Sequence, residues 1–214
     1  MKKIILLFAA LSLVSCSDDD SKKEDKYYVD MVVAEIANGP TVTYEFDYNT
    51  KKQLVTMTAT ASASPEIVTM TYEDNRLKTI GYYTLMYEDG VLNSIVSGSQ
   101  GNQAYPVEYN AAANSYLIDD TNIFLNKYGD IIKYDATEIS YDETKKGALS
   151  SQSAKNIFLI SLLTGVSDML TFKAVIKDND YQITNTYDDN GYIKKAVFPA
   201  GMYYNTLTYS YTKL

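Results

Sequence analysis

The chain of 214 residues contains no histidine and no tryptophan, and it has one cysteine, Cys16, and one arginine, Arg76. Without histidine it lacks the commonest general base, the usual partner of a nucleophilic serine or cysteine, and the commonest transition-metal ligand. A single cysteine permits neither an internal disulfide nor a thiolate metal cluster. These absences predict a protein that is not an enzyme, has no catalytic residues and uses no cofactor and no metal.

Positive charge is also scarce. Nineteen lysines and arginines face 27 acidic residues, for a formal net charge of −8. Removal of residues 1–15, which include Lys2 and Lys3, would bring it to −10. Nucleic-acid binding requires Lys and Arg to neutralise phosphates, and one arginine leaves almost no bidentate phosphate clamp. The charge therefore predicts no nucleic-acid partner.

Tyrosine, in contrast, occurs 21 times. Tyrosine suits half-buried pleated sheets, where the ring packs and the hydroxyl reaches a polar partner. Most of the tyrosines are therefore expected to be sheet residues, and a platform that stacks glycan or peptide is the alternative. Tyr203, Tyr209 and Tyr211 alternate in the last apolar run, which makes them the candidate ligand surface.

A hairpin pattern recurs along the chain. Its clearest copy runs from Tyr187 to Val197, where Asp189-Asn190-Gly191 forms a tight turn between two apolar runs. Asn-Gly between such runs is the strongest short-range hairpin signal. Related copies occupy residues 46–55, 72–80, 87–95 and 128–134, with a weaker one at 109–118. Self-similar units of this kind predict an antiparallel meander.

The Tyr187–Val197 unit resembles the tyrosine-aspartate (YD, Rhs-type) repeat, whose core is Tyr-Asp-x-x-Gly-Arg-Leu-x-x-Ile/Val. The copy at Tyr72–Ile80 keeps Arg76-Leu77 but lacks the glycine. The resemblance implies hairpins that follow one another in a continuous ribbon.

The N-terminus has the form of an export signal. Met1-Lys2-Lys3 precedes an apolar run from Ile4 to Val14, which is too short to span a bilayer and fits a secretory signal. Leu13-Val14-Ser15-Cys16 then resembles the lipobox of bacterial lipoproteins. This resemblance implies cleavage between Ser15 and Cys16 and acylation of Cys16; a lone thiol after an apolar run is the alternative.

A polar segment follows the cysteine. Residues 16–26 contain Asp18-Asp19-Asp20 and read as an acidic flexible tether. The segment also resembles the acidic signal of Bacteroidetes-type surface-exposed lipoproteins. It implies an outer-membrane protein anchored by lipid at Cys16 and facing the cell surface; a plain linker, with the protein on the periplasmic face, is the alternative.

One segment breaks the strand pattern. Ile157 to Leu163 is almost wholly apolar, Ser151 or Ser153 can act as N-cap, and Gly165 stands where a helix ends. We expect a helix over about 152–164 that is buried nearly all round. With Tyr141-Asp142-Glu143-Thr144-Lys145-Lys146 before it, the segment resembles small Bacteroidetes-type lipoproteins of unknown function, and that family supplies no catalytic residues to carry over.

Two turns are rich in oxygen ligands, Asp178-Asn179-Asp180 and Asp188-Asp189-Asn190-Gly191. Neither has the spacing of an EF-hand loop, which ends on a bidentate glutamate. We interpret both as ordinary turns; a calcium site is the alternative.

The sequence thus predicts a mainly β fold, an antiparallel meander sheet that is strongly twisted or a half-barrel, packed on one buried helix. A signal peptide (1–15) and a tether (16–26) would precede a single domain (27–214). The leading hypothesis for function is a non-enzymatic surface lipoprotein that binds or displays a glycan or peptide. A periplasm-facing carrier of lipid or lipoprotein in an apolar cavity is the alternative, and a surface protein without a small ligand is a third.

Overall fold

The computed structural model describes residues 25–61 and 64–214. The proposed signal peptide, Ser15, Cys16 and most of the tether lie outside the described residues. The strands are β1 (Tyr27–Ile36), β2 (Thr41–Tyr48), β3 (Leu54–Thr60), β4 (Glu66–Glu73), β5 (Arg76–Ile80), β6 (Tyr83–Glu88), β7 (Val91–Ser97), β8 (Gln103–Asn110), β9 (Ser115–Ile118), β10 (Thr121–Leu125), β11 (Ile131–Tyr134), β12 (Thr137–Lys146), β13 (Lys173–Asp178), β14 (Tyr181–Gln182), β15 (Thr184–Tyr187), β16 (Ile193–Val197) and β17 (Tyr204–Lys213). A short 3₁₀ helix, η1 (Gly98–Gln100), and one α-helix, α1 (Phe158–Thr164), complete the description.

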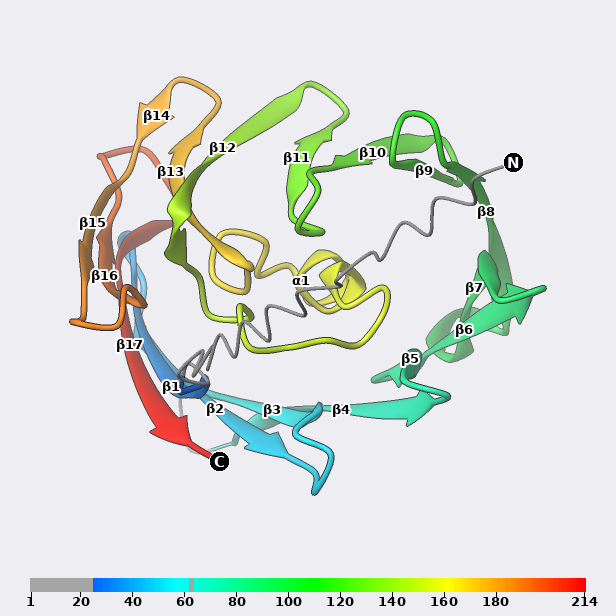
Figure 1. Cartoon of the computed structure of the whole chain (residues 1–214), viewed down its shortest axis with the longest axis horizontal. Coiled ribbons are helices and arrows are strands. Elements are labelled where there is room, and N and C mark those ends of the chain that lie inside the picture. Colours follow the sequence, from blue (N-terminus) through cyan, green and yellow to red (C-terminus); the bar gives the residue numbers. More distant parts are fainter. Residues whose placement is uncertain (1–24, 62–63) are drawn as a thin grey trace, which may run out of the picture.

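The strands form a nearly closed ring around α1 (Figure 1). Each strand except β14 pairs antiparallel with the next along the chain, and β1 pairs with both β2 and β17. Pairing is interrupted between β14 and β15, where Ile183 N–H instead donates to Ile176 O of β13 at 2.9 Å. The predicted antiparallel meander on one helix is confirmed, and it closes further than a half-barrel.

Four of the six predicted hairpins share one local geometry. In these four, a register shift lies immediately before the tyrosine, and the tyrosine then pairs with a buried apolar residue of the return strand. A bulge of this kind bends the strand and redirects the next side chain. The pairs are Tyr48–Leu54, Tyr72–Leu77, Tyr87–Leu92 and Tyr187–Ile193.

Tyrosine hydroxyls connect successive hairpins. Each of four donates a hydrogen bond to the backbone carbonyl of a buried residue in an earlier strand: Tyr48 to Val29 (2.6 Å), Tyr72 to Leu54 (2.7 Å), Tyr87 to Leu77 (2.6 Å) and Tyr141 to Ile131 (2.7 Å). We call these four the tyrosine ladder. Burial raises the pKa of each hydroxyl above its ordinary value, so each remains a donor. The ladder explains part of the tyrosine content by packing.

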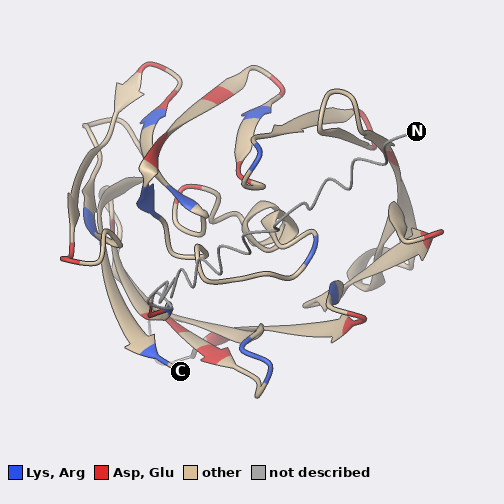
Figure 2. Ribbon diagram, in the orientation of Figure 1, with Lys and Arg blue, Asp and Glu red and all other residues tan. Residues whose placement is uncertain are grey.

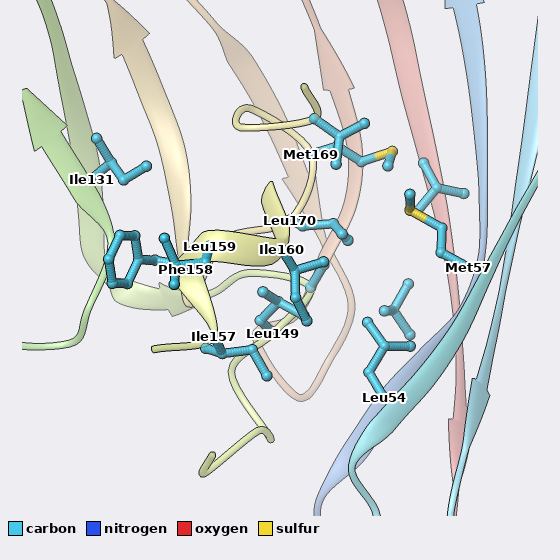
Figure 3. Close-up of a cluster of buried hydrophobic side chains, with 14 of the residues drawn as sticks. Leu54, Met57, Ile131, Leu149, Ile157, Phe158, Leu159, Ile160, Met169 and Leu170 are labelled. Carbon is cyan, nitrogen blue, oxygen red and sulfur yellow. The ribbon is translucent and has the colours of Figure 1, made fainter. Parts of the chain in front are cut away.

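The helix fills the centre of the ring. Leu159 and Ile160 are fully buried, as are Leu149 and Met169 in the segments on either side of α1. Figure 3 shows Phe158 directed toward Ile131 of β11, while Ile160 and Leu149 face Leu54 of β3. Burying such side chains contributes about 1.5–3 kcal/mol each, so α1 serves as the core on which the sheet curls.

The helix is shorter than predicted. It begins at Phe158, because Asn156 has a left-handed backbone (φ 61°) that cannot belong to a helix. The segment before it is held by the sheet instead, since Lys155 N–H donates to Asn75 O at 3.2 Å. Neither Ser151 nor Ser153 caps the helix, because the N-cap position is Ile157 and no side chain caps it; the Ser151 hydroxyl instead donates to Tyr27 O at 2.5 Å. Gly165 (φ 71°) ends α1 as predicted.

Within the described part of the chain, α1 is the one α-helix, and no helix is long and apolar enough to cross a membrane.

Candidate ligand-binding site

Two adjoining hollows open at one end of the ring, which we call the near end. It is the end at which β1 begins and β17 finishes, and alternate turns of the meander also lie there. The hollows have volumes of about 330 and about 600 Å³ and share Lys127, Tyr128 and Phe172. We call the pair the lysine trough. Its charged residues are Asp25, Lys26, Lys127, Lys146, Lys155 and Lys173, and its rings are Tyr116, Tyr128, Phe158, Phe172 and Tyr192.

The turn between β10 and β11 presents Tyr128 to the trough. Asn126 Oδ1 accepts from the backbone N–H groups of Tyr128 (2.8 Å) and Asp130 (3.0 Å). Gly129 adopts φ 98°, and a Cβ there would come within 3.4 Å of the Phe172 ring. A side chain at position 129 would be strained and close to that ring. Hydrogen bonds within the turn thus position Tyr128 next to Phe172 in the trough.

Asp130 ties this turn to the start of β13. Its side chain is 3% exposed, and its carboxylate accepts from the backbone N–H groups of Phe172 (2.5 Å) and Lys173 (3.1 Å). Burial raises the pKa of Asp130 to about 6, and these two donors, together with Asn126, limit the rise. Asp130 therefore acts as a positioning residue for Phe172 and Lys173.

The lysines stand next to aromatic faces. Lys173 Nζ lies 4.3 Å from the centre of the Tyr128 ring, and Lys146 Nζ lies 4.6 Å from that of Tyr192. Ring quadrupoles attract ammonium groups at such distances. Figure 2 shows lysine segments at the end of β12, at the start of β13 and ahead of α1, within the outline of the ring. The trough therefore combines lysine ammonium groups with the aromatic rings that they contact.

Lys127 already has an internal anion. Its Nζ lies 2.7 Å from Glu143 Oε2, and the same oxygen accepts from Tyr128 Oη at 3.3 Å. Both side chains of the ion pair are largely exposed. The pair raises the pKa of Lys127 and lowers that of Glu143. This contact shows how a carboxylate sits against Lys127 and Tyr128.

Buried polar atoms also line the larger hollow. Gln152 is 8% exposed, and among the described residues neither its Oε1 nor Ser150 Oγ has a hydrogen-bond partner. A buried acceptor without a donor costs about 1–3 kcal/mol. Both atoms are shielded from solvent, so they reduce stability without offering a contact to a ligand in the hollow.

The asparagines of the trough have structural roles. Asn156 Nδ2 donates to Tyr87 Oη at 3.2 Å, and its Oδ1 accepts from Tyr116 Oη at 3.1 Å. Asn114 Nδ2 donates to the carbonyls of Leu125 and Asn126, both at 3.0 Å. These amides hold the walls together, so the groups that face a ligand are mainly ammonium groups and rings.

The far end of the ring has a different character. A cavity of about 400 Å³ there is lined by apolar and aromatic residues from β2–β6 and the end of α1, with Glu66 as its single charged residue. Ile67 and Tyr82 are 59% and 57% exposed. Tyr82 and Tyr83 have ring centres 4.5 Å apart. This cavity suits an apolar ligand.

The structure does not bring the three predicted ligand tyrosines together. Tyr203 lies at the far end before β17 and is 63% exposed. Tyr209 is in the core and donates to Met169 O at 3.5 Å. Tyr211 packs on Tyr192 with ring centres 5.1 Å apart. Tyr192 in turn lines the trough, so the last strand contributes to its wall indirectly.

The acidic turns form no recognisable metal site. In residues 25–61 and 64–214, no group of three or more Cys, Asp or Glu side chains is arranged to hold a metal ion. Asn179 Oδ1 accepts from Glu138 N–H at 2.9 Å, and Asp188 Oδ1 accepts from Asn190 N–H at 2.9 Å. Asp188 therefore stabilises its own turn, and Asn179 ties its turn to the start of β12.

Sequence reasoning did not find the trough. Its lysines come from the chain start, the β10–β11 turn, the end of β12, the segment before α1 and the start of β13. No spacing within the sequence connects them. Lys145-Lys146 belongs to the stretch that resembles a family of lipoproteins, and that resemblance does not indicate a binding site. The small number of basic residues is the one feature of the sequence that makes the position of each lysine informative.

Comparisons with known proteins give little beyond a distant likeness of shape. No protein-family model and no curated protein matches the chain. Among solved structures, a porin-like protein from Bacteroides uniformis ATCC 8492 is similar at TM-score 0.47 and 15% identity, covering 86% of this chain and 98% of that one. A porin-like protein from Bacteroides vulgatus ATCC 8482 is similar at TM-score 0.41 and 9% identity, covering 88% and 100%. Neither likeness is close enough to bear on function.

Proposed function

We propose that this protein is a non-enzymatic binding module, held at the outer membrane by a lipid on Cys16, that takes an oligosaccharide in the lysine trough. The observation that carries the proposal is the trough itself, an open concave surface with several aromatic faces at one end of a rigid ring. Ligand sites are typically concave and aromatic with a few convergent polar groups. Tyr128 and Phe172, shared by both hollows, would pack against the apolar faces of sugar rings.

The acidic side chains support a binding role rather than catalysis. Burial raises the pKa of both Asp130 and Asp168 to about 6, but neither residue lines the trough. A hydrolase of glycosides uses two carboxyl groups that face each other across the substrate. The chain also has no histidine to serve as an alternative base.

Glycan-array binding by the soluble chain from Ser21 onward, which contains every described element, tests the proposal. We expect binding that Tyr128→Ser abolishes and that Tyr203→Ser at the far end leaves unchanged. Absence of binding to every glycan would refute the proposal. Loss of binding through Tyr203→Ser alone would move the site to the far end.

Membrane attachment and orientation have a separate test. We expect Cys16→Ser to release the protein from the membrane fraction, because several acyl chains anchor stably where a single apolar contact does not. Protease treatment of intact cells should remove the wild-type protein if it faces outward. Persistence of the protein after that treatment would favour the periplasmic face.

The carrier remains the second candidate because of the apolar cavity at the far end. Its 400 Å³ could hold part of an acyl chain, whereas the centre of the ring is filled by α1. Displacement of a fluorescent fatty acid, lost in Leu163→Asp and kept in Tyr128→Ser, would support this function. No uptake of the probe by the wild-type protein would dismiss it.

A further inference from the structure

We infer that the lysine trough selects an acidic oligosaccharide, one whose sugar rings bear carboxylate or sulfate groups. This inference rests on the proposed function and names the chemical class of its ligand. It is carried by the lysines and aromatic rings that line one concave surface.

The charge of the trough opposes that of the whole protein. The chain has a net charge of −8, yet five lysines and one aspartate line the two hollows. Concave walls of low dielectric concentrate such a field and raise the local concentration of anions. Five of the 19 lysines and arginines thus line one concave surface, which would attract a ligand of negative charge.

The lysines and rings match the two sides of an acidic sugar. Lys173 and Lys146 lie 4.3 and 4.6 Å from the centres of the Tyr128 and Tyr192 rings. Because these ammonium groups stand over the ring faces, a sugar would pack beside them, against Phe172 or the edges of the tyrosine rings, and present its carboxylate or sulfate to the ammonium groups. A neutral sugar would use the ring alone.

The chain itself demonstrates the contact with a carboxylate. Glu143 Oε2 lies 2.7 Å from Lys127 Nζ and accepts from Tyr128 Oη at 3.3 Å. A ligand carboxylate needs the same two partners, so Glu143 competes with it for them. Removing the negative charge of Glu143 should therefore strengthen binding.

A flat anionic membrane fits the near end poorly. The turns at this end carry Asp74, Asp89 and Asp189, all exposed. These carboxylates share the near end with the exposed Lys51 and Lys52 of the β2–β3 turn, so positive charge at this end is not continuous. A single acidic glycan chain needs only the lysines of the trough, whereas a flat anionic bilayer would also meet these carboxylates.

The test uses two ligands of one shape, a trimer of galacturonic acid and its methyl ester, together with a sulfated heparin tetrasaccharide. Titration calorimetry with the soluble chain from Ser21 should show the acid, the sulfated sugar or both binding at least about tenfold tighter than the ester, and more weakly as salt rises. Lys173→Gln should weaken binding of the acidic ligand at least about tenfold, whereas Glu143→Gln should strengthen it. Lys194→Gln, an exposed lysine on the outer side of β16, is the charge-matched control and should change nothing.

Each other outcome overturns the inference in a recognisable way. Equal binding of the acid and the ester would show that the protein binds glycans without selecting for negative charge. Binding of neutral glycans on the array with none of either acidic probe would do the same. If neither the array nor any probe shows binding, the proposed function is refuted as well. Sedimentation with phosphatidylglycerol vesicles that depends on Lys173, without saccharide binding, would assign the trough to the membrane. Thermal unfolding of every variant confirms that the fold is intact.

Discussion

Replacing Tyr72 with phenylalanine tests the tyrosine ladder directly, because the ring stays and one hydroxyl is lost. Tyr72 Oη donates to Leu54 O at 2.7 Å, and Leu54 is fully buried. Without the hydroxyl that carbonyl loses a donor in a place where water has little access. Leaving a buried acceptor unsatisfied costs about 1–3 kcal/mol. In a domain of this size each 1 kcal/mol lowers Tm by about 2–4 °C.

Urea denaturation of the soluble chain measures the loss. We expect the midpoint to fall while the dependence of unfolding free energy on urea stays the same, since the surface exposed on unfolding is unchanged. Tyr141→Phe removes an equivalent bond to Ile131 O, 2.7 Å long, elsewhere in the ring. The two sites share no partner, so the losses in the double variant should add within about 0.5 kcal/mol.

The matched control is Tyr203→Phe, which removes a hydroxyl from a side chain that is 63% exposed. Exposed substitutions usually change stability by less than about 0.5 kcal/mol. If Tyr72→Phe unfolds at the same urea concentration as the wild type, or no earlier than Tyr203→Phe, the ladder does not stabilise the ring and the explanation of the tyrosine content fails.

Two further predictions concern the interior. Burial, together with the Asp178 carboxylate, raises the pKa of Asp168 from 3.8 to about 6. The native state therefore binds more protons than the unfolded chain between these pH values, and stability falls as the pH rises through them. Asp168→Asn should reduce that slope, leaving the part due to Asp130, whose pKa is also raised to about 6, and should stabilise the protein at pH 7 by up to about 3 kcal/mol, as measured by urea denaturation from pH 4 to pH 8; an unaltered slope would contradict the assignment. Gly147→Ala should destabilise the protein by about 1–3 kcal/mol, because the added Cβ would collide with Thr171 O and lie 2.8 Å from Lys173 O. An unchanged Tm for this variant would show that the chain around Gly147 packs less closely than described.

Hairpins were predictable from the sequence because their signals are local. Asp74-Asn75 and Asp89-Gly90 adopt the positive φ values that tight turns between strands require. The residues on each side of these turns alternate between core and solvent, so the two-residue period of the strands and the turn residues both predict a hairpin. The helix was predictable in kind from its apolar run, but its start was not. Lys155 bonds to the β4–β5 turn, 80 positions earlier in the chain, and that distant contact prevents the helix from beginning earlier than Phe158.

The sequence by itself determined the strands, their order, the turns and the presence of one buried helix, because each depends on residues a few positions apart. Tertiary structure alone decided that β17 meets β1, that Asp130 holds Phe172 and Lys173, and that lysines from five separate segments line two adjoining hollows. Those features depend on how far the sheet curls around α1. Curvature is the sum of small twists and bulges over all the strands, and no short stretch of sequence specifies that sum.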